Sequence, residues 1–173
     1  MKFYSGFSLK NEEYLFKEFI NRSEYSVSGF SYGAIKAFGY VKMQLEGGHR
    51  VDTLQLLSPA FFQTKETKFK RVQLLSYKKS KDSYLSNFID SCFAPHTKKI
   101  LEHSKTTIEE LDELLNYKWN MDELRSLTQK GVNIEVYLGG EDNIIDVEGA
   151  REFFLEVATV TYIKNANHFL LTS

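Results

Sequence analysis

Several features common in proteins are scarce in this chain of 173 residues, and each scarcity excludes a class of protein. The single cysteine, Cys92, cannot form an internal disulfide, which excludes a disulfide-stapled domain and favours a reducing compartment. No stretch approaches the roughly 18 consecutive apolar residues of a membrane-spanning helix. The apolar stretch near the N-terminus is too short for a signal peptide. We therefore expect a cytoplasmic protein with no membrane partner.

Net charge is also nearly absent. The formal net charge of −1 at pH 7 gives the whole chain no electrostatic reason to bind nucleic acid, and no nucleic-acid-binding motif is present. A hydrophobic content of 42% and an aromatic content of 14% are typical of a globular protein. The length suits one domain with a sizeable core. We expect one globular domain without a nucleic-acid partner.

The apolar patterns alternate between strand and helix periodicity. Strands are predicted at 2–6, 24–29, 51–58, 133–139 and 160–164. Helices that connect them are predicted at 12–20, 32–45 and 146–157. Because strands joined through helices pair in parallel with right-handed crossovers, we expect an α/β fold with a mainly parallel sheet of about five strands.

Residues 59–130 interrupt this alternation with a helical block that begins at Pro59. Candidate helix N-caps within the block are Asp82, Thr107 and Asn120. Thr107 also forms a capping-box pattern with Glu110. The predicted division is a core of residues 1–58 and 131–173, with residues 59–130 as a helical lid inserted between the third and fourth strands.

The motif Gly29-Phe30-Ser31-Tyr32-Gly33 lies between a predicted strand and a predicted helix. A nucleophile elbow requires this context, and flanking glycines permit its sharp, crowded turn. The N-terminus of the following helix offers free N–H groups and a positive dipole end. Ser31 is therefore a candidate nucleophile; the alternative is a glycine-rich turn without a catalytic role.

A serine hydroxyl is a poor nucleophile until a base takes its proton. Enzymes with this elbow supply the partners in the order serine, acid, histidine. Asp142 follows the fourth predicted strand and His168 follows the fifth, so both lie at carboxyl ends of strands, where such sites gather. The alternative for Asp142 is a turn aspartate without a catalytic role, and Asp146 is the expected cap of the next helix. The alternative for His168 is a solvated histidine near the C-terminus.

A tetrahedral intermediate needs two N–H donors for its oxyanion, each contributing about 3 kcal/mol. We expect one from the backbone of Tyr32, directly after Ser31. The second is expected from the loop after the first strand, where Gly6 permits a bend that frees the N–H of Phe7.

The remaining titratable residues suggest no metal site and no cofactor. His49, His96 and His103 lack metal-ligand spacing, and we expect them to be surface residues. Cys92 lies on an apolar helical face and is expected to be a packed core residue.

Two groups of residues in the segment 59–130 suggest a partner and a substrate channel. The stretch from Gln63 to Lys81 contains seven basic residues and only one acidic residue, Glu66. The basic residues are Lys65, Lys68, Lys70, Arg71, Lys78, Lys79 and Lys81. They form either a docking surface that sets association rate and salt dependence or a solvated helix face. Six aromatic residues line either an apolar channel or plain core: Phe61, Phe62, Phe69, Tyr84, Phe88 and Trp119.

Five segments together resemble the α/β-hydrolases that cleave the methyl ester of pimeloyl-acyl carrier protein in biotin synthesis, the BioV/BioH-type esterases. "FYSGFSL" is similar to their oxyanion loop, "GFSYGA" to their elbow and "LLSPAFF" to the strand end before their lid. "YLGGEDNIID" is similar to their Gly-x-x-Asp turn, and "NANHFLLTS" to their Ala-Ala-His-Ala-Pro-Phe-x-Ser segment. The similarity runs through residues 2–58 and 133–173, and the chain resembles the short, divergent BioV form more than the full-length BioH form.

This resemblance implies a minimal, truncated α/β-hydrolase fold that lacks a strand–helix unit and an N-terminal strand pair of the family. It implies Ser31 as nucleophile, Asp142 as orienting acid and His168 as base, with Phe7 and Tyr32 as oxyanion hole and no metal or cofactor. The implied reaction releases methanol from the terminal ester of a pimeloyl chain whose thioester to an acidic acyl carrier protein survives.

Two alternatives stay open at this point. One is an acyl thioesterase or general short-chain esterase with the same triad. The other is a non-catalytic homologue that binds a carrier protein, which the loss of family core elements would favour.

Overall fold

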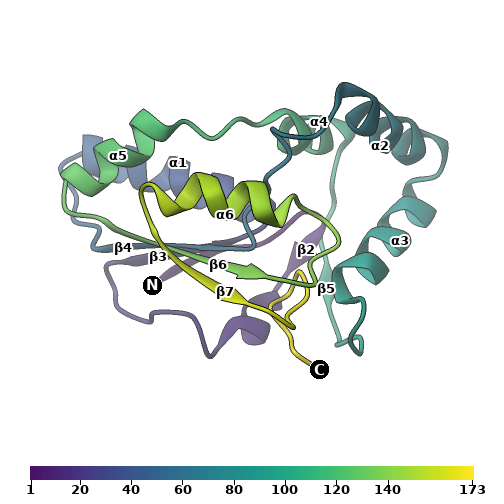
Figure 1. Cartoon of the computed structure of the whole chain (residues 1–173), viewed down its shortest axis with the longest axis horizontal. Helices are drawn as coiled ribbons and strands as arrows, with labels where there is room; N and C mark the ends of the chain where they lie inside the picture. The colour runs from purple at the N-terminus through teal and green to yellow at the C-terminus, as the bar shows by residue number, and fades with distance from the viewer.

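Five strands form one parallel sheet in the computed structural model, which describes all 173 residues (Figure 1). Their order across the sheet is β1-β3-β4-β6-β7, and every neighbouring pair is parallel. The strands are β1 (Lys2–Tyr4), β3 (Ser26–Phe30), β4 (Thr53–Leu57), β6 (Asn133–Gly139) and β7 (Thr159–Ile163). The predicted α/β fold with five strands is confirmed, and each predicted boundary lies close to the observed one.

One face of the sheet is covered by α1 (Tyr32–Glu46), α5 (Met121–Gln129) and α6 (Val147–Leu155) (Figure 1). The inward residues of the strands, such as Leu56 and Val136, are fully buried there against these helices. The Trp119 ring, just before α5, lies 5.5 Å from the ring of Phe38 and 5.2 Å from that of Phe154. The end of the 59–130 segment is therefore part of this core layer.

The opposite face carries no long helix. The predicted helix over residues 12–20 is reduced to the 3-10 helix η1 (Glu12–Phe16), because Asn11 adopts a left-handed conformation and its side chain caps nothing. A second apolar cluster covers the carboxyl half of this face and includes Phe16, Phe30, Leu57 and Phe169. The chain after η1 and the C-terminal segment thus cover this face of the sheet in place of a layer of helices.

Gln55 of β4 fastens the chain after η1 to the sheet. Its Oε1 accepts from the Asn21 N–H (2.7 Å) and the Ser28 hydroxyl (2.9 Å). Its Nε2 donates to the Phe19 carbonyl (2.9 Å) and the Glu135 carboxylate (2.8 Å). Gln55 is only 1% exposed, and its amide satisfies one buried and three partly buried polar partners.

The segment between β4 and β6 contains α2 (Thr67–Lys79), α3 (Lys81–Phe93) and α4 (Ile108–Asn116) before α5. Figure 1 shows α2 and α3 beyond the carboxyl ends of the strands. The strands β2 (Leu9–Lys10) and β5 (Glu102–His103) form a short antiparallel pair that links this segment to the loop after β1. The sequence patterns did not predict this pair. The proposed division at residues 59–130 stays a prediction.

Side-chain caps start α3, α4 and α5, whereas α2 has no side-chain cap at its first turn. The Thr107 capping box with Glu110 is present, and Asn120 caps α5, as predicted. Pro59 does not begin a helix, since helix starts only at Thr67. Asp82 is not a cap either: the Ser80 hydroxyl accepts from the Ser83 N–H and starts α3 two residues earlier than Asp82 would.

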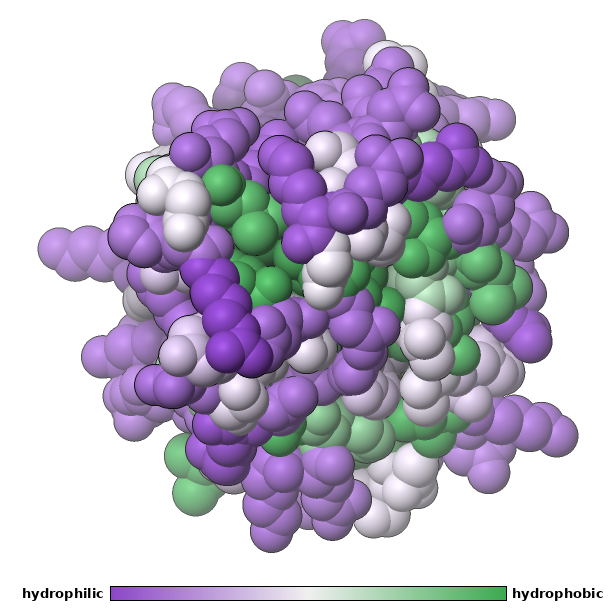
Figure 2. All heavy atoms as spheres, turned by 90° about the vertical axis from the view of Figure 1, so that its left-hand side faces the viewer, coloured by the Kyte–Doolittle hydropathy of each residue, from purple (hydrophilic) through white to green (hydrophobic).

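The end of the molecule opposite α2 and α3 is mostly hydrophilic. Figure 2 views this end and shows hydrophobic atoms mainly in hollows between polar side chains. None of the helices combines the length and apolar character that a membrane crossing demands.

Replacing Gln55 with leucine tests the polar fastening of the second sheet face. Each buried polar partner left unpaired costs about 1–3 kcal/mol, so we expect Gln55→Leu to lower the free energy of unfolding by at least about 3 kcal/mol in urea denaturation. The matched control Gln129→Leu, at the exposed end of α5, is expected to change it by less than about 0.5 kcal/mol. Equal effects of the two substitutions would contradict the stabilising role given to the Gln55 hydrogen bonds.

Candidate active site

Ser31 lies on a strained turn between β3 and α1. Its backbone has φ 53° and ψ −115°, a combination that non-glycine residues rarely adopt. The Ser31 N–H donates to the Leu57 carbonyl at 2.9 Å, which holds the turn against the end of β4. The strain is therefore supported by the neighbouring strand, as expected of an elbow that presents a hydroxyl.

The two flanking glycines are required by close backbone contacts. A Cβ on Gly29 would lie 2.3 Å from the Gly33 carbonyl oxygen. A Cβ on Gly33 would lie 2.1 Å from the Tyr4 carbonyl oxygen and 2.5 Å from that of Ser5. The second contact presses the elbow against the loop that follows β1.

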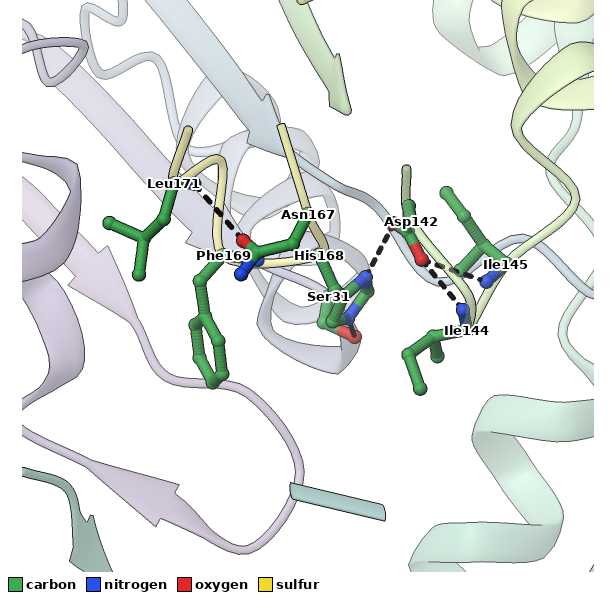
Figure 3. Close-up of polar contacts among 8 residues, drawn as sticks. All are labelled: Ser31, Asp142, Ile144, Ile145, Asn167, His168, Phe169 and Leu171. Carbon is green, nitrogen blue, oxygen red and sulfur yellow. Dashed lines mark hydrogen bonds and ion pairs between the residues drawn. The ribbon is translucent and has the colours of Figure 1, made fainter. Parts of the chain in front are cut away.

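Ser31, His168 and Asp142 form one hydrogen-bonded chain (Figure 3). His168 Nε2 lies 3.0 Å from the Ser31 hydroxyl oxygen, and His168 Nδ1 lies 2.6 Å from Asp142 Oδ2. The three residues are buried, with His168 fully so. The structure thus joins three side chains that are far apart in the sequence.

Asp142 is itself held by backbone donors. Its Oδ1 accepts from the N–H groups of Ile144 (2.7 Å) and Ile145 (3.2 Å), which leaves Oδ2 directed at the imidazole (Figure 3). An imidazole oriented in this way donates from Nδ1 to the carboxylate and accepts the serine proton at Nε2. Asp146, the competing aspartate, caps α6 as predicted for a helix cap.

The two expected oxyanion donors have free N–H groups. Tyr32 is the first residue of α1, so its N–H lacks an intrahelical acceptor. The Phe7 N–H donates to no backbone or side-chain acceptor. The rings of Phe7 and Tyr32 lie 6.5 Å apart, edge to face. Both backbone donors thus come from segments that meet beside Ser31.

Glu12 holds the turn that precedes Phe7, and the sequence did not reveal it. The Gly6 N–H donates to Glu12 Oε1 at 2.7 Å, while Glu12 Oε2 has no partner. The side chain is fully buried, and this burial raises the pKa of the carboxyl. The local sequence Asn11-Glu12-Glu13 reads as an exposed polar run, so only tertiary packing distinguishes Glu12 from Glu13.

Ser31 opens into a cavity of about 590 Å³. Its apolar lining is Phe7, Phe62, Phe69, Tyr84, Phe88, Leu111, Leu114, Leu115 and Ile144. Its polar lining beyond Ser31 is Gln73, Ser76, Lys79, Ser80, Ser83, Asn87, Ser91 and Asn143. The cavity lining therefore mixes apolar and polar side chains, and most of the polar ones come from α2 and α3.

Four of the six predicted channel aromatics line this cavity, namely Phe62, Phe69, Tyr84 and Phe88. Phe61 and Trp119 do not: both are buried in the core layer under α6, where Phe61 packs on Phe154 and the Trp119 indole N–H donates to the Ala60 carbonyl. Helical spacing alone could not separate the two environments, because core and cavity aromatics are equally apolar.

The seven basic residues lie along α2 and around its ends, and none forms an ion pair with a carboxylate. Lys68, Arg71, Lys78, Lys79 and Lys81 are exposed, and Lys65 and Lys70 are half-buried. Lys81 donates to the Thr106 carbonyl at 2.8 Å, and the Lys65 ammonium lies 5.3 Å from the centre of the Phe69 ring.

His96 is the one histidine outside the site whose predicted environment is wrong. His49 and His103 are exposed as expected, but the His96 side chain is only 15% exposed. Its Nε2 lies 2.7 Å from the Asn165 carbonyl oxygen, a contact across 69 residues that no local pattern reveals. Cys92 is a buried core residue as predicted, and burial raises the pKa of its thiol.

An alanine at Gly33 tests the contact between the elbow and the loop after β1. Because its Cβ would overlap the Tyr4 carbonyl, we expect Gly33→Ala to lower the thermal unfolding temperature and abolish any Ser31-dependent activity. Gly39→Ala, in open space on the same helix, is the matched control and should stabilise the protein by about 0.5–1 kcal/mol. Wild-type behaviour of Gly33→Ala would contradict the account of the elbow.

No protein-family model and no curated protein matches the chain in sequence. Solved structures do match. An esterase from Exiguobacterium antarcticum is 17% identical with a TM-score of 0.63, over 83% of this chain and 59% of the esterase. Naproxen esterase from Bacillus subtilis is 20% identical with a TM-score of 0.54, over 84% of this chain and 53% of the esterase.

A third match, BioG from Haemophilus influenzae, is 8% identical with a TM-score of 0.59, over 98% of this chain and 88% of BioG. The chain thus spans little more than half the length of the two esterases and most of the length of BioG. At these identities the likeness shows the fold, and the fold of this chain is that of the α/β-hydrolases.

Proposed function

We propose that the protein is a serine carboxylesterase. The observation that carries this proposal is the chain Ser31–His168–Asp142, with 3.0 Å and 2.6 Å between the bonded atoms, on a strained turn that opens into a cavity. A hydroxyl, an imidazole and a carboxylate in this order are the parts that acyl transfer through a covalent intermediate requires.

The proposed reaction has two halves. His168 Nε2 takes the proton of Ser31 as the serine oxygen attacks the ester carbonyl, and the N–H groups of Phe7 and Tyr32 stabilise the oxyanion. The imidazolium then protonates the leaving alkoxide, which departs as an alcohol. Water, deprotonated by His168, attacks the acyl-enzyme and releases the acid with Ser31 restored.

As substrate we propose the methyl ester of a pimeloyl chain carried by an acyl carrier protein, in a cytoplasmic step of biotin synthesis. Three observations support it. The segments that resemble BioV/BioH-type esterases include the loops that meet at Ser31. The cavity lining includes nine hydrophobic residues, which suit the methylene groups of an acyl chain. The unpaired basic residues on and beside α2 suit an acidic carrier.

An acyl thioesterase is the alternative that the same site favours. A serine hydroxyl activated by a histidine can attack the carbonyl of a thioester as well as that of an ester. The two functions differ in the end of the chain that reaches Ser31, and therefore in the products.

Hydrolysis of pimeloyl-carrier-protein methyl ester separates these functions. We expect the wild-type protein to release methanol and leave the thioester intact, and Ser31→Ala to lose at least about 10⁴-fold in rate because the nucleophile is absent. Mass spectrometry of the carrier distinguishes the products. Free carrier with released acyl chain would establish a thioesterase instead. Carrier binding with no cleavage in either protein would refute catalysis and favour a non-catalytic binding protein.

Charge reversal on α2 tests the proposed carrier. We expect Lys68→Glu/Arg71→Glu to lower kcat/KM for the carrier-bound ester by about tenfold at low salt, with little change for a small free methyl ester. Added salt should reduce the difference, because exposed charges are screened. The matched control Lys17→Glu/Lys130→Glu reverses two exposed charges elsewhere. An equal effect of both pairs would contradict docking on α2.

A further inference from the structure

Asn167, the residue directly before His168, is fully buried and uses both ends of its amide. Its Oδ1 accepts from the N–H groups of Phe169 and Leu171, each at 3.0 Å. Figure 3 shows this amide directed towards Leu171, while His168 reaches the other way towards Ser31. The Asn167 side chain therefore closes the turn on which His168 stands.

The other end of the same amide is attached to the last residue of α3. Asn167 Nδ2 donates to the Phe93 carbonyl at 2.7 Å, and the Phe93 ring packs 4.5 Å from the ring of Phe169. His96, just beyond α3, contacts the Asn165 carbonyl at 2.7 Å. The end of α3 thus contacts the His168 loop both before and after His168 in the sequence.

Backbone hydrogen bonds also hold the His168 segment: the Asn167 N–H donates to the Leu171 carbonyl (3.0 Å), and the Leu170 N–H donates to the Asn167 carbonyl (2.9 Å). Residues 164–173 form neither helix nor strand, and Leu170 has a positive φ of 59°. The Phe30 ring lies 5.0 Å from the imidazole and limits its movement on one side. Placement of Nε2 at 3.0 Å from Ser31 thus depends on what fixes the backbone of this loop.

We propose that Asn167 is a positioning residue for His168, and that its bond to Phe93 couples the base to helix α3. The proposal rests on the proposed serine esterase function. Only a primary amide offers, in this space, an acceptor for two N–H groups and a donor for a carbonyl. Aspartate keeps the shape and the acceptor but lacks the donor when ionised, and leucine lacks both.

The test compares Asn167→Asp and Asn167→Leu with the control Asn165→Ala, whose exposed side chain makes no hydrogen bond. We measure kcat and KM for a p-nitrophenyl ester, the thermal unfolding temperature and the downfield proton resonance of the His168–Asp142 bond. We expect kcat to fall about tenfold in Asn167→Asp and about 100-fold in Asn167→Leu, with KM changed less than about threefold, because displacement of the base impairs proton transfer more than binding.

In both Asn167 variants the proton resonance should also shift or broaden, and in Asn165→Ala it should stay as in the wild type. An unchanged resonance, or an unchanged kcat in folded Asn167→Asp, would overturn the proposal. If Asn167→Asp does not fold, Asn167→Ser replaces it with the same expected signs. An inactive wild-type protein would refute the esterase function instead, and the resonance alone would then decide whether Asn167 positions His168.

Discussion

Close backbone contact between loops at the carboxyl ends of the strands is the constraint on which the rest of the structure depends. Gly33 lies against the carbonyls of Tyr4 and Ser5, and a Cβ on Gly139 would lie 2.4 Å from the carbonyls of Ala166 and Asn167. The first contact joins the serine turn to the loop of Phe7. The second joins the loop of Asp142 to that of His168. Parallel strands bring these loops to one edge, and the absence of side chains lets them approach.

The helices between β4 and β6 serve both the fold and the site. Trp119 and α5 complete the core layer beside α1 and α6, so this segment is not simply a cover. In addition, α2 and α3 supply most of the polar residues that line the cavity, and the Phe93 carbonyl at the end of α3 accepts a hydrogen bond from the His168 loop. The end of α3 is therefore bonded directly to the loop that carries His168.

Local chemistry explains what the sequence predicted well. The five strands, the Ser31 turn and the caps at Thr107 and Asn120 each depend on neighbours in the chain, so pattern and spacing suffice to find them. The His96 contact and the Asn167 Nδ2 bond join residues 69 and 74 positions apart, and Glu12 is set apart from Glu13 by its burial, so no local pattern reveals them. For the same reason the sequence could not decide whether Phe61 and Trp119 line the channel or belong to the core, because burial against α6 leaves no local pattern.

The central claim is that His168 activates Ser31, and labelling with a fluorophosphonate probe tests it most directly, because such probes react readily with an activated serine nucleophile. The account predicts one adduct in the wild-type protein, mapped to Ser31 by mass spectrometry of peptides, and loss of that adduct in folded His168→Ala. Absence of labelling at Ser31 in the wild type, or equal labelling in His168→Ala, would contradict it.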